Sequence, residues 1–328
     1  MTKGYFAPFI HSEKNAPFIY INVLIALIPC IILAIVYYGL RALILLLASQ
    51  ILFFFLDFVF SRLLRPNTIN KDYLDISSVI SGTIFALLLP PDTSVDVVIL
   101  GAFIGSFVVK QLFGGVGTNL LNPAIAARLF VQVVIPGKLT GFSEPLTDFF
   151  KLDTLIDFSG RSAAMGDASS IYAVEVLAGS FATFIGVGSG IAIIIGVFYL
   201  LLKKIVRGYA FFGYLIGVLL MYPLVHLTEF INKSGLASFG IFILTSGVLF
   251  FAIFVLGDFS TMPINPIMRM IVAFFCACLT VFIYDKVDPI TGLCAPVLLV
   301  NIATPSIDYY LGTLSHKEIV KRKAGDAS

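Results

Sequence analysis

The chain has 328 residues, of which 59% are hydrophobic and only 12% are charged, and its formal net charge is +2. A soluble domain usually carries about 25% charged residues. Here apolar blocks recur from one end of the chain to the other, and each is close to the roughly 20 residues that a helix needs to cross a bilayer. The composition excludes a soluble enzyme, a secreted scaffold and a nucleic-acid-binding protein, and it indicates a polytopic membrane protein.

The polar breaks between the apolar blocks give ten candidate membrane spans. They cover residues 19–39, 42–60, 77–90, 95–113, 120–135, 186–202, 208–227, 236–256, 268–284 and 291–307. With the N-terminus inside, most Lys and Arg residues fall in cytoplasmic segments, as the positive-inside rule requires. Both termini are therefore expected to be cytoplasmic. Because residues 1–15 lack an apolar core, we expect the first span, and not a cleavable signal peptide, to target the chain.

The predicted fold is an all-α membrane protein with two inverted five-helix repeats and broken helices at its centre. An odd number of spans per repeat forces the inverted topology; chance similarity between apolar segments is the alternative explanation of the weak internal pattern. In that pattern Asn122-Pro123 has a loose counterpart in Asn301 and Pro305. The expected segments are a cytoplasmic N-terminus (1–18), a first repeat (19–135), an extracytoplasmic loop (136–185), a second repeat (186–307) and a cytoplasmic tail (308–328).

Asp57 and Arg128 are charged residues that lie within predicted spans, away from the first two residues of the span. A charge at that depth costs at least about 2.5–3.5 kcal/mol and is usually functional or paired. Asp57 either lies on an ion path or pairs with Arg62 or Arg65 near the cytoplasmic face. Arg128 either holds an anionic cofactor or a carboxylate, or makes a salt bridge between helices.

Two loop blocks, residues 110–124 and 257–266, are unusually polar and Gly-rich or Pro-rich for a membrane protein. Non-helical backbone in a membrane must be buried in protein or line a cavity, and glycine allows a close approach to another helix or a ligand. The blocks therefore predict a polar site between the halves, with Lys110 extending to the inner interface. The expected lining residues are Gly114, Gly115, Gly117, Asn119, Asn122, Asp258 and Thr261.

Four motifs follow one another along the chain. They are Phe9-Ile10-His11-Ser12-Glu13, Tyr38-Gly39-Leu40-Arg41-Ala42-Leu43, the run from Val108 to Gly117 with Asn122-Pro123-Ala124, and the run from Asp258 to Pro266. Their order resembles that of the D subunits of Rnf electron-transport complexes. The homologous B subunits of sodium-translocating NADH:quinone reductases share the second half of this list.

The resemblance implies a ten-helix subunit, related in fold to urea-channel-type inverted repeats, in a bacterial or archaeal cytoplasmic membrane. It implies one FMN bound covalently on the outer side as a phosphoester to a Thr hydroxyl, and in some members a second, non-covalent flavin (riboflavin or FMN) in the bundle. Electrons would pass through flavin during ferredoxin:NAD oxidoreduction coupled to Na⁺ or H⁺ transport. The implied partners of this non-autonomous subunit are the lipid bilayer and the Rnf subunits A, B, C, E and G, of which G also bears flavin.

The flavin attachment motif of the family, Asp-x-x-Ser/Thr-Gly/Ser-Ala-Thr, is altered in this sequence. Ser162 keeps its spacing from Ser159-Gly160, but it replaces Thr, and Asp157 lies one residue too close. We expect FMN on Ser162, with Arg161 pairing with the flavin phosphate because a guanidinium suits phosphate oxygens. Ser170 is the second candidate. The alternatives are a member without the covalent flavin, a flavin-free transporter or channel on the same fold, and a structural anchor for partner subunits.

The cysteines are predicted to be packing residues. All four lie in apolar stretches, and their spacing matches no metal or iron–sulfur motif. They are Cys30, Cys276, Cys278 and Cys294.

Overall fold

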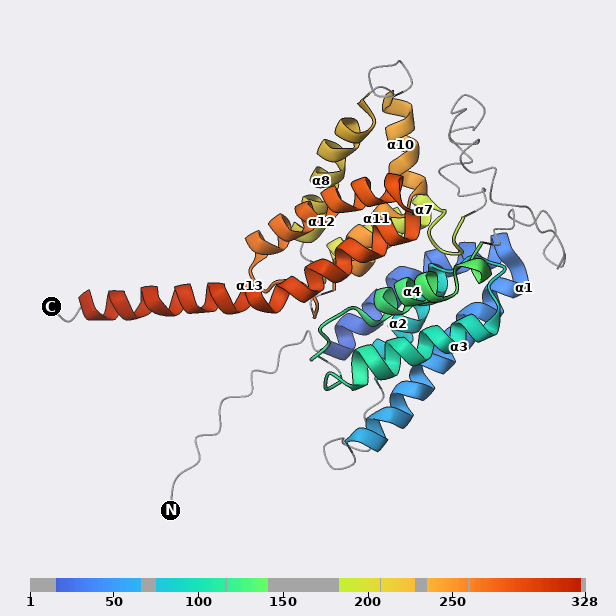
Figure 1. Cartoon of the computed structure of the whole chain (residues 1–328), viewed down its shortest axis with the longest axis horizontal. Coiled ribbons are helices and arrows are strands. Elements are labelled where there is room, and N and C mark those ends of the chain that lie inside the picture. The colour runs from blue at the N-terminus through green and yellow to red at the C-terminus, as the bar shows by residue number, and fades with distance from the viewer. Residues whose placement is uncertain are drawn as a thin grey trace.

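The computed structural model describes residues 16–65, 75–115, 117–140, 183–206, 208–227, 235–258 and 260–325. In these ranges the chain forms helices and loops and no strand, so the all-α prediction is confirmed for the described residues. Figure 1 shows the N-terminal helices α1 to α4 packed side by side on one flank of the bundle, with α8, α10 and α12 on the other flank. The predictions for residues 1–15 and for most of the loop 136–185 lie outside the described residues.

The first helix, α1 (Ala16–Leu64), is broken at Gly39, where φ is 60° and ψ is −141°. A straight helix of 49 residues would be about 73 Å long, more than twice the ~30 Å thickness of the hydrocarbon core. The break divides α1 into two limbs that match the predicted segments 19–39 and 42–60. The first limb contacts α7, with Tyr199 Oη donating to Asn22 Oδ1 at 2.7 Å, and the second contacts α2, with Ser49 Oγ donating to the Gly82 carbonyl at 2.7 Å.

The remaining helices of the first half are short. They are α2 (Ile76–Leu87), α3 (Val95–Phe103), the π-helix η1 (Ile104–Gln111), α4 (Pro123–Val134) and the 3₁₀ turn η2 (Pro136–Lys138). The helix α3 continues directly into η1, so the two form one element. Asn122 begins α4 as its N-cap and accepts hydrogen bonds from the Ala124 and Ile125 amides.

The second half repeats the use of a π-helix. Its elements are α7 (Gly190–Leu202), α8 (Tyr209–Val225), α10 (Gly235–Thr245), α11 (Val248–Phe250), the π-helix η4 (Phe251–Val255), α12 (Pro266–Lys286) and α13 (Pro289–Gly325). Between α10 and α11 the chain bends by 53° at Gly247, which has a φ of +88°. The last helix, α13, extends well beyond the bundle (Figure 1).

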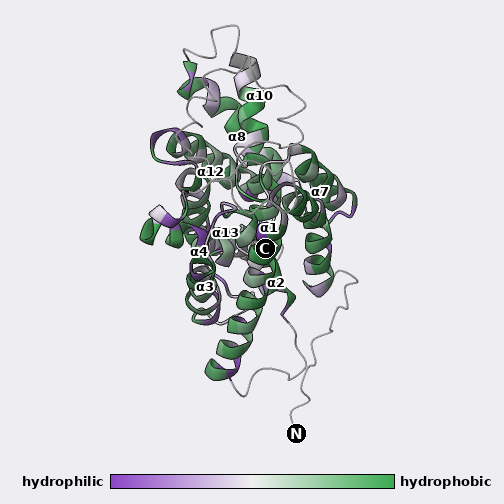
Figure 2. Cartoon of the chain, turned by 90° about the vertical axis from the view of Figure 1, so that its right-hand side faces the viewer, coloured by the Kyte–Doolittle hydropathy of each residue, from purple (hydrophilic) through white to green (hydrophobic). Residues whose placement is uncertain are grey.

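The outer surface of the bundle is apolar. Large apolar side chains such as Ile51, Leu63, Val133 and Phe198 are more than half exposed, and the helices in Figure 2 are predominantly hydrophobic along their length. Among the described residues, three helices are long and apolar enough to cross a membrane, and the bent α10–α11 pair adds a fourth. This surface is that of a membrane protein; ten spans in inverted repeats stay a prediction.

Close packing of α8 on α12 depends on Gly213 and Gly217. A Cβ at Gly213 would lie 2.3 Å from the Met270 carbonyl oxygen, and one at Gly217 would lie 2.6 Å from the Ala277 Cβ. Small residues four positions apart allow such close approach between membrane helices. We expect Gly213→Ala to lower the free energy of unfolding by about 1–3 kcal/mol through overpacking, measured as a lower thermal midpoint in detergent. Gly240→Ala is the matched control, because nothing lies within 4 Å of its added Cβ; equal shifts in both variants would contradict the prediction.

Candidate functional site

A cavity of about 70 Å³ lies where the two predicted loop blocks meet. One loop contributes Asn119 and Asn122, and the other contributes Asp258 and Ser260. The helix α2 adds two hydroxyl groups, from Ser77 and Ser81. The apolar part of the lining includes Ile19, Tyr20, Val23, Ile80, Ile84, Leu200, Val206, Ile253 and Phe254.

The two loops share a sequence pattern and a helix cap. Residues 114–123 read Gly-Gly-Val-Gly-Thr-Asn-Leu-Leu-Asn-Pro, and residues 257–266 read Gly-Asp-Phe-Ser-Thr-Met-Pro-Ile-Asn-Pro. Each loop follows a π-helix. Each ends in an Asn-Pro pair that begins a helix: Asn122 caps α4, and Asn265 Oδ1 accepts from the Ile267 amide (2.9 Å) and the Met268 amide (3.3 Å). The loops are therefore two copies of one unit of sequence and helix capping, although Gly114, Gly115 and Gly117 have positive φ angles and their counterparts Gly257, Asp258 and Ser260 do not.

This pairing differs from the predicted correspondence of Asn122-Pro123 with Asn301 and Pro305, which belongs to the inverted repeat and stays a prediction. Asn301 lies within α13 and joins the two loops. Its side-chain nitrogen donates to the Thr261 carbonyl at 3.1 Å, and its side-chain oxygen accepts from the Asn122 amide at 3.1 Å. In the predicted span order both loops lie on the cytoplasmic side, so the local repeat runs in parallel and is separate from the predicted inverted repeat.

The cavity lining contains a carboxyl and an amide oxygen that differ in their hydrogen bonding. The Asp258 carboxylate accepts from the Ser260 amide (3.0 Å), the Ser260 hydroxyl (2.8 Å) and the Thr261 hydroxyl (3.4 Å). Burial nevertheless raises the pKa of the Asp258 carboxyl above its ordinary value, outweighing these hydrogen bonds and the charge of Arg269. Asn119 Oδ1 is buried and has no hydrogen-bond partner among the described residues.

The raised pKa of Asp258 predicts a pH-dependent stability that Asp258→Asn removes. The folded protein binds this proton more tightly than the unfolded chain does, so the stability that the group contributes is present below the unfolded pKa and is lost as pH rises through the folded pKa. We therefore expect the thermal midpoint of the variant, relative to wild type, to rise with pH. Thermal unfolding of both proteins from about pH 4 to pH 8 measures this difference, and a difference that is constant with pH would contradict the prediction.

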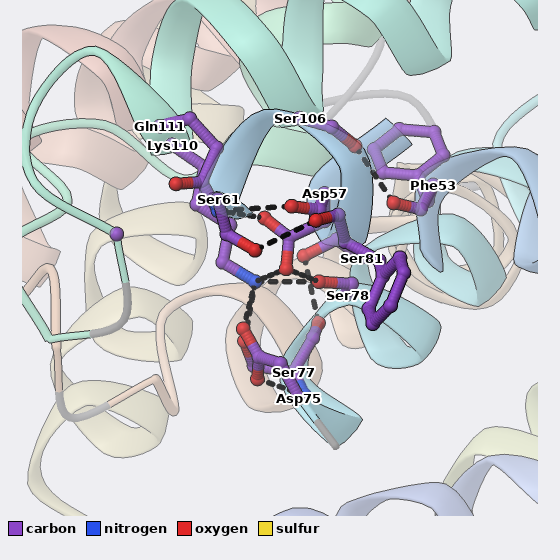
Figure 3. A network of polar contacts seen from close by, with 12 residues as sticks. Phe53, Asp57, Ser61, Asp75, Ser77, Ser78, Ser81, Ser106, Lys110 and Gln111 are labelled. Carbon is purple, nitrogen blue, oxygen red and sulfur yellow. Dashed lines mark hydrogen bonds and ion pairs between the residues drawn. The ribbon is translucent and has the colours of Figure 1, made fainter. Parts of the chain in front are cut away.

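Beside the cavity, Lys110 forms the centre of a buried polar cluster, which Figure 3 shows. The lysine is 1% exposed, and its Nζ lies 3.2 Å from Asp57 Oδ2 and also pairs with Asp75. The prediction that Lys110 extends to the membrane interface is therefore wrong. The π-helix η1 turns Lys110 and Gln111 into the bundle, where Gln111 Nε2 donates to Asp57 Oδ1 at 2.5 Å.

The cluster balances its charges across four segments of the chain. Asp57 lies in α1, Asp75 precedes α2, and Arg65 follows α1 and donates to Gln111 Oε1. Burial raises the pKa of the Asp75 carboxyl, but the Lys110 ammonium and hydrogen bonds from Ser77 outweigh it and hold this pKa below its ordinary value. Asp57 is thus an ion-paired carboxylate, and its partner is Lys110; its link to Arg65 runs through Gln111.

Arg128 lies apart from the cavity, fully buried in α4. Its Nε donates to the Leu88 carbonyl at 2.9 Å, and its Nη1 donates to Gln132 Oε1 at 2.9 Å. The guanidinium also lies 5.7 Å from the centre of the Phe184 ring. These contacts tie α4 to the C-terminal end of α2, where carbonyl groups carry partial negative charge.

Comparison with known proteins identifies the family. The model of the NQR2, RnfD, RnfE family matches residues 5–315. The chain belongs to this family. The D subunit of the Na(+)-translocating ferredoxin:NAD(+) oxidoreductase complex of Acetobacterium woodii is 30% identical over 317 residues, covering 93% of this chain and 92% of the relative. The D subunit of the ion-translocating oxidoreductase complex of Escherichia coli is 24% identical over 338 residues, covering 93% of this chain and 95% of the relative. The resemblance seen in the sequence motifs is confirmed.

The predicted site residues other than Arg128 divide into four groups. Asn119, Asn122 and Asp258 line the cavity. Thr261 lies beside it and accepts a hydrogen bond from Asn301 through its carbonyl. Gly114, Gly115 and Gly117 shape the loop, with φ angles of 114°, 88° and 82° that favour glycine. Asp157, Arg161, Ser162 and Ser170 lie outside the described residues.

Sequence reasoning missed Asp75 and Ser77, and it named Asn301 without predicting that this residue joins the two loops. Asp75 and Ser77 precede and begin a predicted span, where a polar residue normally marks a boundary. Asp75 does cap α2, accepting from the Ser77 amide at 2.9 Å, but its second oxygen pairs with Lys110. The Asn-Pro pair at 265–266 was a signal that could have revealed the repeat of residues 114–123.

Proposed function

We propose that this protein is the D subunit of an Rnf-type complex that couples ferredoxin:NAD oxidoreduction to Na⁺ or H⁺ translocation. Its family membership, the names of its full-length relatives and its apolar helices support this role. The chain would act as a non-autonomous subunit, together with subunits A, B, C, E and G, in a bacterial or archaeal cytoplasmic membrane with both termini cytoplasmic.

We propose further that a non-covalent flavin binds at the cavity between the two loops, which must widen from about 70 Å³ to take the three-ring system. The observation that carries this proposal is Asn119 Oδ1, a buried acceptor without a partner among the described residues, in a cavity lined by both loops. A flavin ring presents an N–H donor, carbonyl acceptors and two apolar faces. Asn119 would accept from the N–H, and Ile80 and Phe254 would contact the ring faces. When bound, the flavin supplies one- and two-electron transfer.

Asp258 fits a role beside a redox group. Its raised pKa allows the carboxyl to hold a proton at a pH where an ordinary aspartate is ionised. The Ser260 and Thr261 hydroxyls fix its orientation from within the same loop. Asp258 would therefore exchange a proton when the charge in the cavity changes, which is the chain's own contribution to coupling.

The covalent FMN on Ser162 is a separate proposal, with Arg161 and Asp157 beside the flavin phosphate. A serine hydroxyl can form the same phosphoester as the threonine of the family motif. We expect the denatured subunit, made with its partner subunits, to fluoresce in a gel under ultraviolet light and to carry the mass of one FMN. Ser162→Ala is expected to abolish both signals, and Ser170→Ala is the matched control that retains them.

Each other outcome of this experiment decides between the alternatives. Fluorescence that survives in Ser162→Ala but is lost in Ser170→Ala would move the attachment to Ser170. A dark, unmodified wild-type subunit would rule out covalent FMN. If the native complex then also released no flavin from this subunit on denaturation, a flavin-free transporter or anchor would replace the proposed role.

A further inference from the structure

The ammonium of Lys110 lies in a cage of oxygen atoms, visible in Figure 3. Its Nζ is 3.2 Å from Asp57 Oδ2, 2.9 Å from Ser77 Oγ and 2.5 Å from Ser78 Oγ, and it pairs with Asp75 Oδ2. An ammonium has only three N–H donors, so the four surrounding oxygen atoms outnumber the hydrogen bonds that it can donate. A set of ligands made only of oxygen is what hard metal cations prefer.

The fold does not require charges at this position. The second copy of the unit, η4 with residues 257–266, has Ile253, Phe254 and Val255 in the stretch that corresponds to Lys110 and Gln111, and all three are buried. That loop still turns, and Asn265 still caps α12. Burying an ion costs several kcal/mol before pairing compensates. Because the second loop forms without such ions, we infer that Lys110 and its carboxylate partners have a role other than shaping the first loop.

The backbone around Lys110 has the features of a segment that can move. Lys110 lies near the end of the π-helix η1, and π-helical turns are frequent at functional sites. A one-residue change of register toward α-helical geometry rotates a side chain by about 100°. Gly114 and Gly115, both at positive φ, follow two residues after η1 ends. With these features, the ammonium would be able to leave the cage while α1, α2 and the α2 cap, which carry the oxygen ligands, stay in place.

The cage is adjacent to the cavity between the loops. Ser77 belongs to both, because its hydroxyl contacts Lys110 Nζ and the residue also lines the cavity. Only the Ser77 side chain separates the cavity from the cage. A change of charge in the cavity therefore alters the electrostatic potential at the cage, because buried charges are weakly screened.

We propose that Asp57, Asp75, Ser77 and Ser78 form a binding site for a monovalent metal cation, in which the Lys110 ammonium is a tethered occupant that a transported Na⁺ displaces. Both cations carry one positive charge, so the exchange preserves the charge balance of the cluster. The proposal rests on the ion translocation proposed above and does not depend on a bound flavin.

The test removes the Lys110 ammonium from the oxygen cage and is carried out on the intact complex. Lys110→Ala removes the tethered cation and leaves all four oxygen ligands. We expect NaCl, compared with choline chloride at equal ionic strength, to slow amide hydrogen exchange in residues 76–80, since the Ser77 and Ser78 amides bond to Asp75. The slowing is about tenfold when Na⁺ is present at about ten times its dissociation constant. Adding Asp57→Asn to Lys110→Ala is expected to abolish it.

Controls and a transport measurement complete the test. Lys138→Ala, at an exposed lysine paired with Asp96, should respond to Na⁺ no more than wild type does. Should Lys110→Ala not assemble, Lys110→Gln takes its place with the same expectation. In liposomes, the Lys110 variant is expected to take up ²²Na⁺ with a lower half-saturating concentration than wild type.

An absent Na⁺ effect in the Lys110 variant, or one that persists in the double variant, would overturn the cation site. An unchanged half-saturating concentration would overturn the displacement. Flavin content, measured on the same preparations by fluorescence, separates failure of this proposal from failure of the proposed flavin function.

Discussion

Replacing Asp57 by Ala is expected to lower the free energy of unfolding by about 3–5 kcal/mol, the cost of removing one partner from a buried ion pair. The Lys110 ammonium would keep Asp75 but lose Asp57 Oδ2 at 3.2 Å, and the Gln111 amide would lose its acceptor at 2.5 Å and keep only the Asp57 carbonyl at 3.4 Å. Neither group reaches water, since Lys110 is 1% exposed and Gln111 is 4% exposed. The effect is measured by heating the purified complex. At each temperature, the amount of this subunit that remains in the assembled complex is determined, and its midpoint is compared between variant and wild type.

Two variants show whether the loss arises from the buried charge. Asp57→Asn keeps a carbonyl oxygen for Gln111 and removes only the charge, so we expect a smaller shift of the midpoint. Asp96→Ala breaks an ion pair with Lys138 in which both side chains are 54% exposed, and exposed pairs contribute little to stability. If Asp57→Ala and Asp96→Ala shift the midpoint equally, the cluster is not a buried charge network.

Hydropathy alone located most helices, because the lipid phase requires long apolar segments. The break in α1 at Gly39 lies between the predicted segments 19–39 and 42–60, and the helices α4 and α12 begin at Asn-Pro pairs, within three residues of the predicted boundaries. These features depend on local sequence. They were predictable because a cap, a glycine or a proline acts within a few residues of its own position.

The Lys110 cluster was not predictable in the same way. Lysine near the end of an apolar block normally reaches the interface, and that expectation assumes regular α-helical geometry. The π-helix η1 changes which face Lys110 presents, and its partners Asp57 and Asp75 come from positions 53 and 35 residues earlier. Neither the local geometry nor the distant pairing has a signal in hydropathy.

The correspondence between the two loops was missed for a different reason. Matching the spans in order placed Asn122 opposite Asn301, whereas the shared pattern of ten residues places it opposite Asn265. The order of spans describes topology, but the Asn-Pro cap describes local backbone geometry, and here the two give different pairings. Asn301 has its own role as the bridge between the loops.

Replacing Asn301 by Leu is expected to separate the two loops and to release the flavin proposed for the cavity. Asn301 is 1% exposed, and its side chain is the contact that joins the Thr261 carbonyl to the Asn122 amide, at 3.1 Å each. In the variant the Asn122 amide is left unpaired, which costs about 1–3 kcal/mol. Because Asn122 also caps α4, movement of this residue displaces Asn119 and the adjacent cavity wall.

The matched control is Thr304→Val, one turn further along α13. Thr304 Oγ1 donates to the same Thr261 carbonyl at 3.2 Å but does not contact the loop of Asn122 through a side-chain hydrogen bond that the structure describes. Valine has nearly the same shape, so Thr304→Val weakens one anchor of the second loop and keeps the bridge. We expect Asn301→Leu to lose most of its non-covalent flavin during purification and Thr304→Val to retain it, as measured by flavin released on denaturation per complex. Equal retention in the two variants would show that the bridge does not hold the cavity together, because of these two residues only Asn301 contacts both loops among the described contacts.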